Sequence, residues 1–181
     1  MVFLICGFMG AGKSTFLDKI QKNHTGTDFF FDLDQEIYSR KKNSDSEHLG
    51  ALIEKAGWEQ FRSWEIEILK ELIENSKNLH SNKKADIFIS LGGGSVTEVL
   101  LSIIKTNSEI HLIWLNTPFE ICWQRIENDC ERPLVQKGVN YLKELYKKRE
   151  KYYQNARICL SASEQDMLWT TQKLKEAFDL D

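Results

Sequence analysis

The chain has 181 residues, a formal net charge of -3 and 41% hydrophobic residues. A chain of this length is typical of one domain that buries most of its apolar surface without disulfides or structural metals. The near balance of 24 basic and 27 acidic side chains argues against a nucleic-acid-binding surface, which needs a strong basic bias. We therefore expect one domain over residues 1–181, monomeric and without a nucleic-acid partner.

The four cysteines are scattered, with no Cys-x-x-Cys pair and no histidine at metal-ligand spacing. Reduced thiols in a cytoplasmic protein are the simplest interpretation. The apolar start "MVFLIC" has no basic flank, is too short to cross a bilayer and runs directly into a glycine-rich loop. We therefore expect a cytoplasmic protein with no signal peptide and no membrane contact.

Short apolar segments alternate with longer amphipathic ones along the chain. "VFLIC", "DFFFD", "DIFISL", "IHLIWL" and "RICLS" predict strands, and the segments between them have the apolar spacing of helices. This alternation predicts an α/β fold with a parallel sheet covered by helices on both faces. Ligands of such sheets bind at the carboxyl ends of the strands, and the polar clusters of this sequence fall there or in the helices that follow.

The first predicted strand runs into "GFMGAGKST", residues 7–15, which we call the phosphate loop because it matches the P-loop pattern G-x-x-x-x-G-K-[ST]. In this pattern, backbone N–H groups and the helix dipole bind nucleotide phosphates. Lys13 is expected to reach the β- and γ-phosphates, and the Ser14 hydroxyl to ligate Mg²⁺. A glycine-rich turn that matches by coincidence is the alternative. The expected nucleotide-binding residues of the loop are Gly10, Ala11, Gly12, Lys13, Ser14 and Thr15.

The second predicted strand ends in "FFFDLDQEI", which contains Asp32 and Asp34. If the strand geometry continues, the two carboxylates share one face at the carboxyl end of the strand. One carboxylate could then hold Mg²⁺ through water while the other accepts a hydrogen bond from a substrate hydroxyl. The alternative is an aspartate pair that caps the next helix.

An aromatic-rich helix is predicted to begin near Gly57, in "GWEQFRSWE", and it carries Arg62. The planar guanidinium suits a carboxylate held through two hydrogen bonds. An arginine beside Phe61 and Trp64 can also lie over the core. The residues themselves support both interpretations equally.

Gly92, Gly93 and Gly94 follow the third predicted strand, and we call them the glycine loop. Three glycines at the end of a strand let a ligand approach the backbone closely. A loose loop is the weaker interpretation, because another helical stretch follows.

Thr117 is expected to cap a helix with Pro118 at its first position, and "RIENDCERPLV" then supplies Arg125 and Arg132. This charged, proline-containing segment between two helices is typical of a mobile lid, whose closure would bring an arginine to the charge that develops during phosphoryl transfer. An ordinary surface loop is the alternative. The following helix is predicted to begin near Val139.

The end of the chain gives weaker signals. "KKREKYY" places Arg149 one helical turn before Tyr153, which by itself is typical of a solvated basic face. Ser163 is expected to open a last amphipathic helix over "ASEQDMLWTTQKLKEAF".

In this order, the motifs resemble shikimate kinase, a small P-loop kinase of the nucleoside-monophosphate-kinase type. The matching features are "GFMGAGKST", the D-x-D of Asp32 and Asp34, "FRSWE", "GGG", "RPLV" and the R-x-x-x-Y of Arg149 and Tyr153. The resemblance implies a three-layer α/β/α P-loop kinase fold with a five-stranded parallel sheet. It also implies a substrate-binding helical region at about residues 34–65 and a lid at about residues 127–138.

The resemblance implies ATP-dependent phosphorylation of the 3-hydroxyl of shikimate, a step of the chorismate and aromatic amino acid pathway. By the same resemblance, Lys13 and Arg132 would stabilise the transferring phosphoryl group, and Ser14 with Asp32 would hold Mg²⁺. Asp34 would bind and orient the attacking hydroxyl and accept its proton.

For the substrates, the resemblance implies that Arg62 and Arg149 bind the shikimate carboxylate and that the backbone of the glycine loop meets the ring hydroxyls. Arg125 matches a position that packs against adenine.

Two departures from the family pattern keep alternatives open. "TEVLLSIIK" lacks the usual asparagine-arginine pair, and "SRKKNSDSEHLGALIEKAG" is longer than usual. One alternative is a related kinase of gluconate or a nucleoside monophosphate, which leaves D-x-D and the arginine pair unexplained. The other is a non-catalytic nucleotide-binding regulator.

Overall fold

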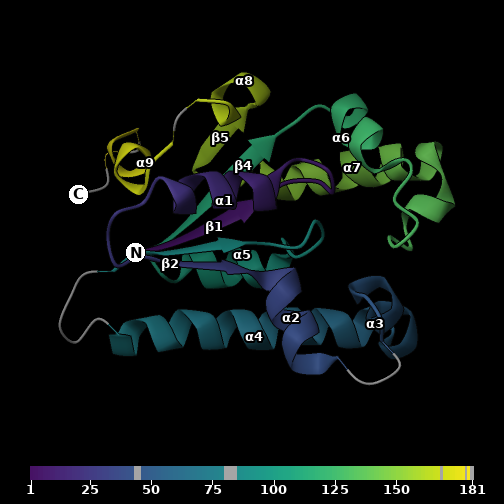
Figure 1. The fold of residues 1–181 in the computed structure, drawn as a ribbon, viewed down its shortest axis with the longest axis horizontal. Coiled ribbons are helices and arrows are strands. Elements are labelled where there is room, and N and C mark those ends of the chain that lie inside the picture. Colours follow the sequence, from purple (N-terminus) through teal and green to yellow (C-terminus); the bar gives the residue numbers. More distant parts are fainter. Residues whose placement is uncertain (43–45, 80–84, 168, 178, 180–181) are drawn as a thin grey trace.

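The architecture was obtained as a computed structural model, which describes residues 1–42, 46–79, 85–167, 169–177 and 179. Within these residues, five strands form one sheet in the order β2-β3-β1-β4-β5 (Figure 1). Every neighbouring pair in the sheet is parallel. The predicted α/β fold with a five-stranded parallel sheet is confirmed.

The strands coincide with the five apolar segments of the sequence. They are β1 (Val2–Cys6), β2 (Phe29–Asp32), β3 (Ile87–Ser90), β4 (Ile110–Asn116) and β5 (Ile158–Ser161). Every residue of β1 and β3 is buried, because strands inside a parallel sheet are covered on both faces. Since all strands run the same way, their carboxyl ends meet along one edge of the sheet.

Three phenylalanines lie side by side on neighbouring strands and support this register. Phe88 on β3 is stacked on Phe3 of β1 with ring centroids 4.7 Å apart, and on Phe30 of β2 at 5.3 Å. Phe88 is also the register partner of both residues. Stacked aromatic pairs stabilise by about 0.5–1.5 kcal/mol beyond burial, so a slip of one residue would lose two such pairs.

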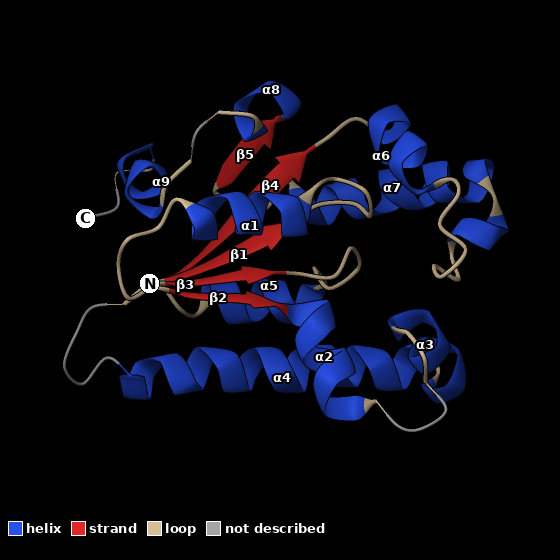
Figure 2. Ribbon diagram, viewed as in Figure 1, coloured by secondary structure: helices blue, strands red, loops and turns tan. Residues whose placement is uncertain are grey.

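Helices cover the sheet on both faces (Figure 2). In the described residues they are α1 (Lys13–Lys22), α2 (Leu33–Lys41), α3 (Leu49–Ala56), α4 (Trp58–Leu79), α5 (Glu98–Lys105), α6 (Phe119–Ile126), α7 (Val139–Tyr153), α8 (Ala162–Gln165) and α9 (Thr171–Ala177). In this view α1 crosses the front of the sheet and α5 lies behind it. No helix among these residues is long and apolar enough to cross a membrane.

Helices α2, α3 and α4 pack against one another beside β2 and form a separate group below the sheet in Figure 1. The long segment after Asp34 supplies α2 and α3, and its residues 43–45 lie outside the described part of the chain. The segment between α6 and α7 reaches toward α3 from the other side of the molecule. The two features predicted as substrate-binding region and lid therefore face each other.

The predicted cap of the helix after β4 is wrong. Helix α6 begins at Phe119 with Pro118 at the cap position, and no side chain bonds its first turn. Thr117 is buried, and its hydroxyl donates instead to the carbonyl of Ala11 in the phosphate loop at 2.9 Å. Buried hydroxyl groups are almost always hydrogen-bonded, and here the Thr117 hydroxyl bonds the loop carbonyl and not the N–H groups of α6.

The single amphipathic helix predicted after residue 161 is also wrong in the described residues, because the segment forms α8 and α9. Ser161, not Ser163, caps α8 by accepting from the Glu164 N–H, and Glu164 returns the bond in a capping box. Helix α8 ends at Gln165, and the indole N–H of Trp169 donates to the Glu164 carbonyl in its last turn. Residues 168 and 178 of this segment lie outside the described part.

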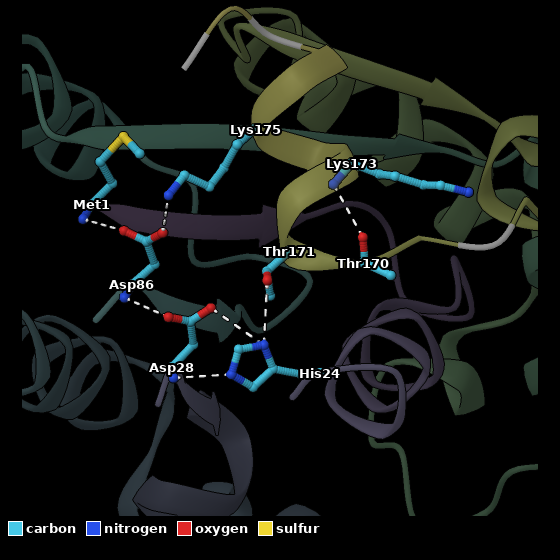
Figure 3. Close-up of polar contacts among 8 residues, drawn as sticks. All are labelled: Met1, His24, Asp28, Asp86, Thr170, Thr171, Lys173 and Lys175. Atoms are coloured by element: carbon cyan, nitrogen blue, oxygen red, sulfur yellow. Dashed lines mark hydrogen bonds and ion pairs between the residues drawn. The ribbon is translucent and has the colours of Figure 1, made fainter. Parts of the chain in front are cut away.

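Helix α9 is fixed to the amino ends of the strands by a polar cluster (Figure 3). Asp86 bonds the α-amino group of Met1 at 2.7 Å and Lys175 of α9 at 2.9 Å. His24 contacts Thr171 at 3.3 Å, and Asp28 accepts from the Asp86 N–H at 2.9 Å. Burial by itself would raise the pKa of Asp86, but the hydrogen bonds and positive charges of its two partners outweigh burial and lower it.

Candidate active site

The carboxyl ends of the strands border a cavity of about 310 Å³. Its lining comes from side chains of the phosphate loop, α2, α3, α4, residues 129–134 and α7, and from the backbone of the glycine loop. Most residues predicted from the sequence to form the site line this single cavity: Ser14, Asp32, Asp34, Arg62, Gly92, Gly93, Gly94, Arg132 and Arg149. This volume is at the lower end of the range of small-molecule pockets.

The phosphate loop has the backbone conformation of an anion site. Gly10 and Gly12 have φ of 79° and 95°, which only glycine adopts easily. A Cβ on Gly10 would also lie 2.5 Å from the Cys122 carbonyl of α6. Helix α1 follows at once with no acidic residue in its first turn, so its first N–H groups and the positive end of its dipole are suited to binding an anion.

Lys13 lies over the loop, where its ammonium donates to the Phe8 carbonyl at 3.1 Å. Burial lowers the pKa of Lys13, and the negative charge of Asp34 opposes this shift. The lysine is therefore a cation that the protein desolvates, and an anion bound at the loop would compensate it.

The expectation that the strand continues through Asp34 is wrong, because β2 ends at Asp32 and α2 begins at Leu33. Asp32 combines the two alternatives left open by the sequence. One carboxylate oxygen caps α2 by accepting from the Gln35 N–H at 3.2 Å, and the other accepts from the Ser14 hydroxyl at 2.7 Å. The Ser14 and Asp32 oxygens are the hard donors that Mg²⁺ prefers, so this pair fits the predicted metal.

Asp34 in the first turn of α2 faces the cavity. Burial raises its pKa to about 6, and the negative charges of Asp32 and Glu65 add to this shift, while Lys13 and Arg132 oppose it. A carboxylate with a pKa near the working pH can accept a proton and release it again.

The two arginines predicted to bind a carboxylate meet at the glycine loop. A Cβ on Gly94 would collide with one guanidinium nitrogen of Arg62 and one of Arg149. The interpretation of Arg149 as part of a solvated basic face is wrong, since α7 turns it inward over the Phe8 ring at 5.7 Å. Its NH1 nitrogen is buried without a hydrogen-bond partner in the described part of the chain. Burial lowers the pKa of Arg149.

Glu65 is a site residue that the sequence reasoning missed. It is 2% exposed and accepts hydrogen bonds from Arg62 and from the Ser95 hydroxyl. A Cβ on Gly92 would lie 2.8 Å from carboxylate oxygens of both Asp34 and Glu65. The absence of a side chain at Gly92 therefore leaves room for both carboxylates beside the glycine loop. The motif "FRSWE" contained the signal, because Arg62 and Glu65 are three residues apart and such residues are neighbours on a helix.

The segment predicted to be a lid, residues 127–138, consists of turns and one short 3-10 helix, Val135–Lys137. Arg132 is paired with Asp129 at 2.6 Å, and its charge affects the pKa of both Lys13 and Asp34. Arg125 lies outside the cavity, where its guanidinium donates to the Gly10 carbonyl at 3.0 Å. Arg125 is thus at the back of the phosphate loop, a position compatible with contact to a nucleotide base.

Comparisons with known proteins agree with this geometry. The family model described as shikimate kinase matches residues 9–178. A shikimate kinase of Persephonella marina is 34% identical over 161 residues, covering 88% of this chain and 87% of the relative. One from Aquifex aeolicus is 32% identical over 158 residues, covering 87% and 83%.

A solved structure of shikimate kinase from Acinetobacter baumannii in complex with shikimate has a TM-score of 0.73 and 26% identity. The superposition covers 98% of this chain and 93% of that one. The phosphate loop, the acidic pair and the arginines thus lie in a chain that matches the family along almost its whole length. The chain belongs to the shikimate kinase family.

Proposed function

We propose that this protein transfers the γ-phosphoryl group of ATP to the 3-hydroxyl of shikimate, giving ADP and shikimate 3-phosphate. One observation carries the choice of acceptor. Arg149 has a buried donor with no partner in the described residues, next to Arg62 and in the cavity that the phosphate loop borders. A carboxylate of a small acid would accept from both guanidinium groups.

The acceptor is bound through complementary charges. Arg62 and Arg149 hold the carboxylate at the Gly94 end of the cavity. The carboxylates of Asp34 and Glu65 face the Gly92 end and accept hydrogen bonds from ring hydroxyls. A ring that carries a carboxylate on one side and hydroxyls on the other satisfies both ends. Neither gluconate, which is open-chain, nor a nucleoside monophosphate matches this layout as directly.

The donor lies along the phosphate loop, where Lys13 and the first N–H groups of α1 bind the β- and γ-phosphates. In the transfer, the shikimate oxygen forms a bond to the γ-phosphorus while the bond from that phosphorus to the β,γ-bridging oxygen breaks. Asp34 accepts the hydroxyl proton, and ADP leaves with the bridging electrons. Lys13 and Arg132 stabilise the charge on the transferring group.

Mg²⁺ bound through Ser14 and Asp32 would neutralise part of the phosphate charge. The hydrogen bond between these two side chains holds both oxygens on the same side of the loop before any nucleotide binds.

We assign the parts of one domain, residues 1–181, accordingly. The region of about residues 34–65 binds the acceptor, and the lid at about residues 127–138 supplies Arg132. Arg125 packs against adenine. The monomeric state and the cytoplasmic location stay predictions from the sequence.

The test is ADP release by the purified protein with MgATP and, in separate reactions, shikimate, gluconate, AMP, CMP or no acceptor. Release that depends on shikimate, with shikimate 3-phosphate identified by mass spectrometry, supports the proposal. Release with gluconate or a nucleoside monophosphate instead would assign a related kinase. ATP binding without transfer to any acceptor would favour a non-catalytic regulator.

A further inference from the structure

Gly50, the second residue of α3, is a buried glycine with no backbone reason to be one. Its φ is not positive, so other residues could adopt its conformation. Glycine is also the poorest helix former after proline. An alanine at this position would favour α3, and the glycine therefore needs another explanation.

The explanation lies in the lid. A Cβ on Gly50 would lie closer than 3.0 Å to the carbonyl oxygen of Glu131, a distance that real Cβ atoms essentially never show. It would also lie 3.0 Å from the ring Nδ1 of His48, which caps α3. The lid atom belongs to the backbone and cannot rotate away as a side chain would. Only a residue without a side chain allows the lid to lie against α3 here.

This contact adjoins the lid arginine assigned to phosphoryl transfer. Glu131 directly precedes Arg132, and Pro133 follows with a fixed φ, so the chain between the contact and the arginine has little freedom. Arg132 is close enough for its charge to affect Lys13 and Asp34. The contact at the Glu131 carbonyl therefore fixes the backbone next to Arg132, and Asp129 holds the Arg132 side chain at 2.6 Å.

We infer that Gly50 is a positioning residue for catalysis: its missing side chain forms the contact point on which the lid closes and aligns Arg132. The inference rests on the proposed phosphoryl transfer for its effect on rate. The contact itself does not depend on that function. Helix α3 also borders the cavity, through Leu49, Gly50 and Ile53.

The rate test compares wild-type protein with Gly50→Ala and with Glu54→Ala, which changes an exposed residue of the same helix. We expect Gly50→Ala to lower kcat about 100-fold, the effect of a displacement of about 1 Å at a reacting centre. We also expect unchanged ATP affinity without shikimate and an unfolding temperature equal to or above that of the wild type. Glu54→Ala should behave as wild type. A Gly50→Ala protein with wild-type kcat would overturn the inference.

Combining variants distinguishes positioning from general damage. If Gly50 acts through Arg132, adding Gly50→Ala to an Arg132→Met protein should lower the residual rate by less than twofold. A loss as large as in the wild-type background would show that Gly50 acts by another route, and the inference would fail.

A second measurement does not use activity. A glutamyl endopeptidase can cut after Glu131 only when the carbonyl that lies against Gly50 becomes accessible. We expect several-fold faster cleavage at this bond in Gly50→Ala than in wild type or Glu54→Ala. Equal cleavage rates would refute the contact. Loss of transfer activity in the wild type with this difference intact would refute only the proposed function.

Discussion

Replacing Arg149 by methionine should weaken shikimate binding without destabilising the fold. Arg149 reaches the cavity from α7, and its NH1 nitrogen is buried without a partner in the described residues. Methionine keeps much of the length and can pack its thioether against the Phe8 ring, and it removes the charge, the cation–π contact with that ring and the unpaired donor. In the free protein, little that stabilises the fold is lost.

The size of the effect follows from the contacts. Losing one arginine from a desolvated pair that binds a carboxylate costs about 2–4 kcal/mol, which is roughly a 30- to 700-fold increase in the Kd of shikimate. The free energy of unfolding should stay equal or rise by about 1 kcal/mol, because a buried cation with an unsatisfied donor is removed.

Arg62→Met provides the contrast. It should weaken shikimate binding to a similar degree, but it also leaves Glu65, which is 2% exposed, without its charged partner. Removing one partner of a buried ion pair destabilises a fold by about 3–5 kcal/mol. The two arginines should therefore have similar effects on binding and opposite effects on stability.

The assays are isothermal titration with shikimate and urea unfolding, with Lys148→Met as the control. Lys148 is an exposed cation on the same helix, and its replacement should change neither quantity. An Arg149→Met protein that binds shikimate within threefold of wild type, or that loses as much stability as Arg62→Met, would contradict these expectations.

Three further changes test other parts of the structure. Asp34→Asn should lower kcat about 100- to 10,000-fold with nucleotide affinity unchanged, and a wild-type rate would remove Asp34 from the chemistry. Asp86→Asn should cost about 1–2 kcal/mol of unfolding free energy at pH 7. Because the pKa of Asp86 is lowered in the fold, its contribution is complete above the unfolded pKa of about 3.9 and is lost as pH falls through the folded pKa. Urea unfolding should therefore show the gap between variant and wild type narrowing as the pH falls below about 4, and a constant gap would contradict this. Thr117→Val leaves the Ala11 carbonyl without its donor, so ATP binding should weaken about 5- to 100-fold in a titration, whereas unchanged affinity would show that the bond does not hold the phosphate loop.

The fold around the phosphate loop was predictable because its determinants are local. The phosphate loop follows β1 and precedes α1 within consecutive residues, so strand, turn and helix signals all agree there. Strands β1 and β3 were predictable for a similar reason, since a fully buried parallel strand needs an unbroken apolar run. The predicted helix cap and the predicted single C-terminal helix were wrong because a nearby hydrogen-bond partner outweighed the local sequence preference. Thr117 bonds the phosphate loop and not its own helix, and Trp169 bonds Glu164 where the segment divides.

The sequence by itself determined the class of fold, the phosphate loop and, through a resemblance, the family. Only the tertiary structure decided that Arg149 turns inward beside Arg62, that Glu65 faces Asp34 across Gly92, and that Gly50 lies under the lid. The physical reason is the separation of these groups along the chain. A residue's neighbours within one helical turn can be read from its spacing, but a contact between α3 and the lid, or between α4 and α7, exists only after the sheet has brought those helices to one edge.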